Sequence, residues 1–221
     1  MAVFSVERPQ KFVGASTDTK PTHCKHGSTF YAYDTGVTYI TNDGGSTWTS
    51  KSGAGTGTLK EVRVSKAIAA AAGYTANDVV NDDVCTTTSA PWTFAGVTKD
   101  NGGYSYITAA TIFSESEGVV PRLTLFLFNT TPTGSLTDNV ASTNPIKADM
   151  GKYIGQIDFP ALASIGTAAS TAVASPSTVG NLPLAFKTVT VDDIYGVLVT
   201  ADSFTQTATD DIEITLMVDQ Y

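Results

Sequence analysis

Basic residues are scarce in this chain. Its 221 residues include 13 Lys and Arg against 21 Asp and Glu, which gives a formal net charge of -8. Arginine occurs only at Arg8, Arg63 and Arg122, and the chain has no cluster of Lys and Arg. Nucleic-acid binding depends on such clusters, because they neutralise phosphates and release counterions. The composition therefore argues against a nucleic-acid partner and suits a protein kept soluble at high copy number.

Long apolar runs and closely spaced cysteines are also missing. No segment approaches the ~20 apolar residues of a bilayer span, and the first residues lack the basic and apolar stretches of a secretory signal. Cys24 and Cys85 are the only cysteines and lie far apart in the sequence. We expect a soluble fold that does not depend on disulfides, made in a reducing cytoplasm, without a membrane partner.

The remaining composition is that of a folded protein, with 42% hydrophobic and 15% charged residues. Such a chain is apolar enough to bury a core and too poor in charge to stay disordered.

Residues 1–29 are polar, contain two prolines and show no periodicity, so we expect an extended N-terminal arm. Residues 30–51 show three short strand patterns separated by turns, which predicts a small β-meander. Residues 52–60, rich in Gly, Ser and Thr, read as a linker.

The strand patterns after the linker predict a larger domain over residues 61–221. The segment 122–129 would carry apolar side chains on both faces of a strand, and so would the segment 194–200. In contrast, apolar residues alternate with polar ones over 212–218, which indicates a strand with one wet face. Many strands joined by Thr-rich turns without a repeat period predict an all-β, two-sheet, jelly-roll-like sandwich.

One segment of the predicted meander, residues 41–48, matches the Asp-box pattern of sialidase propellers. The pattern is physically a hairpin turn: Asp43 caps turn amides, Gly45 takes a positive φ, and Trp48 packs under the turn. None of these roles is catalytic, and a propeller would need several copies, whereas this chain has one. We therefore interpret Asp43, Gly45 and Trp48 as structural turn residues.

Two groups of residues raise the question of a metal site. His23, Cys24 and His26 lie close together, but zinc ligands come in spaced pairs with a further ligand elsewhere. Asp78, Asp82 and Asp83 could hold calcium in a loop, but they lack the regular spacing of a calcium-binding loop. We expect no metal and no other cofactor, with a polar arm and ordinary loop carboxylates as the plainer interpretation.

Catalytic signatures are equally weak. Paired carboxylates, which could in principle serve glycoside hydrolysis, lie mostly beside turn-like sequence, at Asp82-Asp83, Asp192-Asp193, Asp210-Asp211 and Glu115/Glu117. The chain contains neither a nucleophile elbow nor a phosphate-binding glycine loop. Both histidines fall in the expected arm, far from any nucleophile of the main domain. We expect a protein that is not an enzyme.

Aromatic residues suggest two kinds of contact surface. Trp92, with Phe94, Tyr104 and Tyr106, could line a platform for sugars, although core or subunit packing would use the same residues. Phe126 and Phe128 occupy the second face of a strand whose first face carries three leucines.

A sandwich buries only one face of each sheet, and the loops rich in Ala, Ser and Thr are thin cover for paired Phe rings. This reasoning predicts a homo-oligomer with Phe126 or Phe128 near the contact.

Six segments after the linker and one before it carry a recognisable pattern, namely ANDVV at 76–80, APWTF at 90–94, PRLTLFLF at 121–128, DFPAL at 158–162, NLPL at 181–184, YGVLV at 195–199 and GSTFYAYDTG at 27–36. The first six resemble a β domain that recurs in tailed-bacteriophage structural proteins, particularly capsid decoration (head auxiliary) proteins, and this resemblance covers roughly residues 62–219. The last resembles a short module appended to many virion proteins, over residues 27–40.

This resemblance implies a jelly-roll-like domain, assembly as an oligomer, often a trimer, and no chemistry of its own. It leads us to expect a decoration protein assembled in the host cytoplasm and located on the capsid surface of the virion, with the major capsid protein and further copies of itself as partners. The alternative is a receptor- or carbohydrate-binding module of a phage fibre or tail. A glycosidase is a third hypothesis that the residues do not favour.

Overall fold

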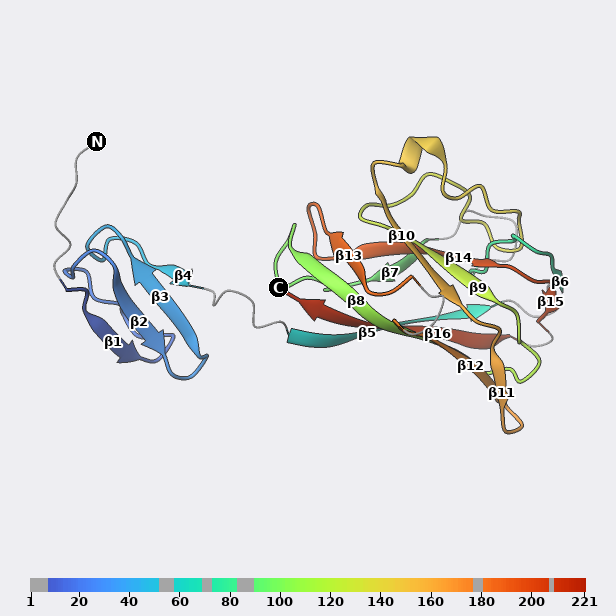
Figure 1. Ribbon diagram of the computed structural model, residues 1–221, viewed down its shortest axis with the longest axis horizontal. Helices are drawn as coiled ribbons and strands as arrows, with labels where there is room; N and C mark the ends of the chain where they lie inside the picture. The colour runs from blue at the N-terminus through green and yellow to red at the C-terminus, as the bar shows by residue number, and fades with distance from the viewer. Residues whose placement is uncertain (1–7, 52–57, 69–72, 83–89, 177–180, 207–208) are drawn as a thin grey trace. The chain divides into compact units, whose positions relative to one another are not determined.

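The computed structural model describes residues 8–51, 58–68, 73–82, 90–176, 181–206 and 209–221. The chain divides into two compact units, Met1–Thr56 and Gly57–Tyr221, which we call the N-terminal unit and the main unit (Figure 1). The described elements are β-strands, apart from one short 3-10 turn, η1 (Lys147–Asp149). The fold is therefore all-β, as the sequence predicts.

The N-terminal unit is a four-stranded sheet in the order β1-β2-β3-β4 (Figure 1). Its strands are β1 (Lys11–Gly14), β2 (Ser28–Ala32), β3 (Val37–Thr41) and β4 (Thr49–Lys51). The last three form the expected meander, but β1 adds a fourth strand that pairs with β2 in parallel. The expectation of an extended arm over residues 1–29 is thus wrong for its described part from Lys11 onward, because hydrogen bonding to β2 gives those residues a place in the sheet.

Aromatic rings fill the interior of this small unit. The Trp48 ring lies edge-on to Phe12 and Phe30, with ring centroids 6.3 and 6.2 Å apart. The Lys20 ammonium lies 4.1 Å from the centre of the Tyr39 ring, a cation–π contact. These contacts explain how so short a stretch of strands holds its shape.

The main unit contains two larger sheets that face each other. One sheet runs in the order β11-β12-β8-β16-β5, with β13 also paired to β8; its strands are β11 (Ala163–Ile165), β12 (Ala169–Ala174), β8 (Tyr104–Ser114), β16 (Asp210–Gln220), β5 (Thr58–Ile68) and β13 (Leu184–Lys187). The other runs β10-β9-β14-β7; its strands are β10 (Tyr153–Phe159), β9 (Leu123–Phe128), β14 (Ile194–Thr200) and β7 (Trp92–Phe94). A further pair joins β15 (Phe204–Thr205) to β6 (Gly73–Tyr74).

The first of these strands begins earlier than the sequence suggests. Thr58, Leu59 and Lys60 already belong to β5 and pair with β16. The predicted linker over residues 52–60 therefore wrongly includes the first three residues of this strand. Residues 52–57 lie outside the described part of the chain.

The core lies between the two sheets. Apolar residues of β16 alternate along the strand, so that Ile212, Ile214 and Leu216 are all fully buried while Glu213 and Thr215 are not. From the opposite sheet, Leu123, Leu125 and Leu127 of β9 meet them in the same cluster. The alternation in the sequence correctly identified the one-sided strand, and the burial confirms a sandwich-type fold.

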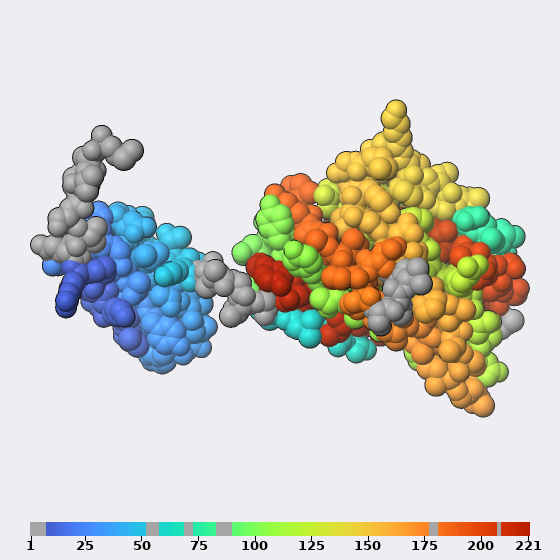
Figure 2. All heavy atoms as spheres, in the orientation of Figure 1, coloured from blue at the N-terminus to red at the C-terminus, as the bar shows by residue number. Residues whose placement is uncertain are grey.

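The second face of the four-stranded sheet is covered by the chain itself, which overturns one expectation. Phe128 is 0% exposed and packs with Val79, Leu136, Val197 and Val199. Leu136 belongs to the long connection between β9 and β10, which rises over this side of the main unit as a cap, drawn in yellow (Figures 1 and 2).

Phe128 therefore cannot lie at a contact between copies, contrary to the sequence-based prediction. Phe126 remains half-buried against the same cluster. The Phe rings therefore do not require an oligomer, because a loop without periodic sequence covers Phe128 within the chain.

No helix in the described part of the chain is long and apolar enough to span a membrane. Cys24 is a free thiol, whereas Cys85 lies outside the described residues.

Candidate functional site

The side of the six-stranded sheet that faces away from the core is the most distinctive surface of the main unit. The register of the strands defines this outer face, because side chains alternate between the two sides of a sheet. Phe113 of β8 lies beside Glu213 of β16, which in turn lies beside Ser65 of β5. Tyr106 lies beside Asp219 in the same way. Most of the large apolar side chains that the main unit exposes gather on this face, namely Leu59, Tyr104, Tyr106, Phe113, Ile165, Val173 and Tyr221.

Three tyrosines form a cluster at one end of the outer face. Tyr104, Tyr106 and Tyr221 are 60%, 43% and 49% exposed, although tyrosine usually buries much of its ring. The rings of Tyr106 and Tyr221 meet edge to face, with centroids 5.7 Å apart. The Lys187 ammonium lies 5.2 Å from the centre of the Tyr104 ring, and the Tyr221 hydroxyl donates a hydrogen bond to Asp219 at 2.8 Å. This tyrosine cluster offers flat apolar area with polar groups beside it.

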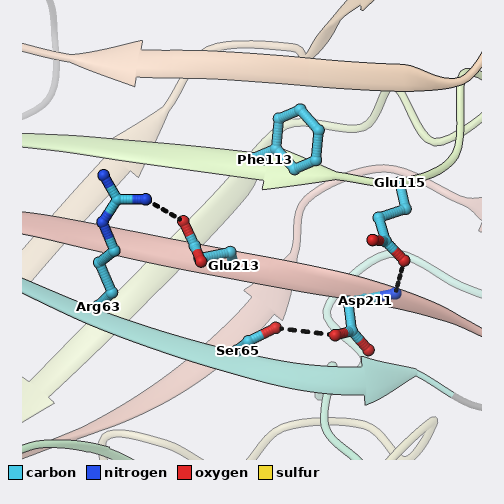
Figure 3. Close-up of a pocket in the computed structure, with 6 residues that line it drawn as sticks. All are labelled: Arg63, Ser65, Phe113, Glu115, Asp211 and Glu213. Carbon is cyan, nitrogen blue, oxygen red and sulfur yellow. Dashed lines mark hydrogen bonds and ion pairs between the residues drawn. The ribbon is translucent and has the colours of Figure 1, made fainter.

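A shallow depression lies at the other end of the outer face, with Phe113 at its edge (Figure 3). Its lining residues come from β5, β8, β16 and the residue after β8, and they are Arg63, Ser65, Phe113, Glu115, Asp211 and Glu213. Figure 3 shows Arg63 directed toward Glu213 and Ser65 directed toward Asp211, each across neighbouring strands.

Hydrogen bonds link the groups of this depression into pairs. Arg63 Nη1 lies 3.2 Å from Glu213 Oε1, and Arg63 also pairs with Glu61 on its own strand. The Ser65 hydroxyl donates to Asp211 Oδ2 at 3.2 Å, and the Asp211 amide donates to Glu115 Oε2 at 3.2 Å. The two acids beside Arg63 raise the pKa of its guanidinium, Glu61 more strongly than Glu213. Such solvent-exposed pairs contribute little to the free energy of unfolding.

The N-terminal unit also has an open sheet face. Val13 and Tyr31 are paired side by side on β1 and β2, and both are exposed. Thr38 of β3 and Lys51 of β4 continue the row across the sheet. This face is much smaller than the outer face of the main unit.

The turn residues of the N-terminal unit have structural roles. Asp43 accepts hydrogen bonds from the Thr47 amide at 2.9 Å and from the Thr41 hydroxyl at 2.8 Å, and bonds from Thr47 are the main reason that its pKa falls to about 2. Gly45 has a φ of 96°, and Trp48 Nε1 donates to the Pro21 carbonyl at 3.1 Å. All three residues hold a turn.

Trp92, which we expected at a binding surface, is buried instead. Its ring is 1% exposed and its Nε1 donates to the Val80 carbonyl at 3.1 Å. Phe94 is buried as well, so only Tyr104 and Tyr106 of the proposed aromatic platform reach the surface. The reason is that Trp92 and Phe94 lie at alternate positions of β7, the short edge strand, and both point into the core.

The groups considered for metal binding do not converge. His23 and His26 each contact a backbone carbonyl, of Thr22 and Asn42 respectively. Asp78 accepts hydrogen bonds from Thr75, and Asp82 pairs with Lys66, whereas Asp83 lies outside the described residues. Within the described ranges, no group of three or more His, Cys, Asp or Glu side chains is arranged to hold a metal ion.

The sequence pointed only partly to this surface. Tyr104 and Tyr106 were candidates because of their aromatic character, and the polar residues of β16 indicated a wet face. Tyr221 and Phe113 were missed, because nothing local in the sequence shows that their strands lie next to each other. Polar and apolar residues alternate along β5, with Glu61, Arg63 and Ser65 on one side. This alternation was the sequence signal that β5 contributes to the outer face.

Comparison with known proteins adds no relative. No protein family, curated protein or solved structure matches this chain.

Proposed function

We propose that this chain is a non-enzymatic structural protein of a tailed-phage virion, which binds the capsid surface as a decoration protein. The observation that carries the proposal is the outer face, a broad sheet surface that leaves apolar and aromatic side chains in water. Exposed apolar side chains that gather on one face among charged residues are typical of a site of protein interaction. The similarity of the segments quoted above to virion proteins supplies the partner, the major capsid protein.

The outer face suits such a partner for physical reasons. A sheet is rigid, so docking on it costs less conformational entropy than ordering a loop. Exposed tyrosines bring large contact area with few rotatable bonds and often dominate binding energy. The surrounding charges, Arg63, Glu115, Asp211, Glu213 and Asp219, would set the orientation of the partner.

Self-association is part of the same proposal. With Phe128 buried, the expectation of a homo-oligomer rests on the virion resemblance, which favours a trimer. Sedimentation of the purified chain should then give a multiple of its 23.1 kDa mass. A monomer at all accessible concentrations would remove self-association from the proposal and leave capsid binding to be tested separately.

Co-sedimentation of the full-length protein with purified capsids tests the main proposal. Tyr106→Ala and Phe113→Ala should each weaken binding, and a residue at the centre of the contact should weaken it roughly tenfold or more. Met150→Ala is the matched control, because Met150 is 57% exposed and belongs to the β9–β10 connection rather than to the outer face. If all three variants bind capsids as tightly as the wild-type protein does, the outer face is excluded as the docking surface.

Carbohydrate binding is a second candidate, favoured by the tyrosine cluster alone. Exposed aromatic rings stack on the apolar faces of sugars, and here Lys187 and Asp219 could bond the hydroxyls. A glycan array probed with the wild-type chain and with Tyr106→Ala tests it. Binding to a defined glycan that Tyr106→Ala abolishes would support a fibre or tail module, whereas no glycan binding leaves only the decoration role.

A further inference from the structure

Lys66 lies in an unusual setting for a lysine. It sits on β5 at a position that faces the core side of the sheet, and its side chain is 8% exposed. Its Nζ lies 2.6 Å from Asn81 Oδ1, 2.7 Å from the Ala90 carbonyl oxygen and 3.0 Å from Asp82 Oδ1. The Trp92 ring covers the group, with its centre 5.6 Å from Nζ. A buried primary amine and a buried carboxamide therefore meet beside a carboxylate that is partly open to water.

The carboxamide of Asn81 is held in one orientation. Asn81 is 1% exposed, and its Nδ2 donates to the carbonyls of Ala90 at 3.1 Å and Leu136 at 2.9 Å. Its own backbone amide donates to buried Asp138 at 2.8 Å. On the other side of the carboxamide, the backbone amide of Asp82 donates to Asn81 Oδ1 at 3.1 Å. The carbonyl oxygen that touches the lysine is therefore also polarised by a fixed N–H group.

We propose that Lys66 and Asn81 form an intramolecular amide, an isopeptide bond, with Asp82 as the proton carrier. Because a C=O bond is about 1.23 Å long, Asn81 Cγ lies within about 3.8 Å of Lys66 Nζ, which is close to the approach distance of a reacting pair. A lysine amine becomes a nucleophile when it is desolvated and an adjacent base takes its proton. Burial and the Asp82 carboxylate provide these two conditions.

The proposed reaction is balanced without any further reactant. A proton passes from Lys66 Nζ to Asp82, and the neutral amine attacks Asn81 Cγ. The oxyanion that forms at Oδ1 is stabilised by the Asp82 N–H group. A second proton passes from Nζ to Nδ2, the Cγ–Nδ2 bond breaks and ammonia leaves. Ammonia then takes the proton held by Asp82 and reaches water as ammonium, since the Asp82 side chain is 42% exposed.

The bond would fasten an edge of the sandwich. Among the described residues β5 pairs with β16 on one side only, and Asn81 follows a segment that is bonded to β14 through Val80 and the Leu198 carbonyl. The covalent link would thus tie an outer strand of one sheet to a segment packed on the other. The inference is independent of the proposed function, because it depends only on this cluster.

Mass spectrometry of the purified full-length protein tests the inference. The expected mass is that of the sequence less one ammonia molecule, and digestion should yield a branched peptide that joins Lys66 to Asn81. Lys66→Arg and Asn81→Ala should each restore the full mass. Asn81→Asp should still form the bond, now with loss of water, and reach the same product.

The contrary outcome is equally clear. The same contacts would suit an ammonium that stays charged and is simply hydrogen-bonded by three oxygens. If the wild-type protein has its full mass, and Lys66 is recovered in an unbranched peptide that reacts with an amine reagent after unfolding, the inference is wrong. This result needs no variant, so it stands even where a substitution prevents folding.

Discussion

At the residue scale, position 45 requires glycine for two separate reasons. Its φ of 96° lies in the left-handed region, and a Cβ there would press against the Pro21 carbonyl oxygen and lie 3.0 Å from Cys24 Sγ. The turn is therefore closed by backbone that leaves no room for a side chain. The positive φ follows from the local turn pattern, which is why the sequence alone suggested it, whereas the close approach of Pro21 and Cys24 depends on the fold.

Gly45→Ala should destabilise the N-terminal unit more than Gly36→Ala does. Gly36 also has a positive φ, of 69°, but a Cβ there would meet nothing within 4 Å, so it bears only the conformational cost of ~1–2 kcal/mol. Denaturant unfolding followed by the indole N–H signal of Trp48 measures both variants. Equal losses would show that Gly45 is needed for its φ alone.

Asp43 should make the N-terminal unit sensitive to acid. Its pKa of about 2 lies below the ordinary 3.8, chiefly because Thr47 donates to the carboxylate. A carboxyl group with a depressed pKa contributes stability that is complete above the unfolded pKa and is lost as the pH falls through the folded one. The contribution of Asp43 should therefore disappear between about pH 4 and pH 2.

Acid titration of the Trp48 indole signal checks this expectation, with Asp43→Asn as the comparison. The variant lacks the titrating group and should lose less stability over that pH range. An identical acid response in both proteins would mean that other carboxyl groups control the transition.

At the element scale, β9 shows which structural features could be predicted from the sequence and which could not. Its apolar residues at consecutive positions correctly predicted a strand covered on both sides. The sequence could not show what covers the second face, because Leu136 and Val79 come from irregular segments without a periodic pattern. The same limit hid β1, whose four residues pair with β2 across a polar stretch of chain.

Phe128→Ala should cost about 3–5 kcal/mol of unfolding free energy, the usual loss for a fully buried Phe ring. Phe126→Ala should cost less, because its ring is only partly buried. Urea unfolding of both variants measures the difference. If both variants lose a similar, small amount of unfolding free energy, Phe128 does not belong to an internal cluster and lies at the surface.

At the scale of the whole molecule, the division into two units shows that a truncation should fall between the units and not after residue 29. Removing residues 1–29 would take away β1 and the first two residues of β2, and would therefore break the N-terminal sheet rather than remove a free arm. The main unit has its own core between two sheets. A chain of residues 57–221 should consequently keep its fold.

The indole N–H signal of Trp92 provides the measurement for this truncation. Its chemical shift reports the buried position and the hydrogen bond to Val80, so it should be the same in the truncated and full-length proteins. A shifted or broadened signal would show that the main unit depends on the N-terminal one.

Locating the protein on the virion tests whether this chain decorates a phage capsid through an exposed sheet face. Electron microscopy of intact tailed-phage particles that contain this chain, labelled with an antibody against its main unit, would show the position. We expect regular label over the surface of the head and none on the tail. Label confined to the tail or its fibres would contradict this expectation.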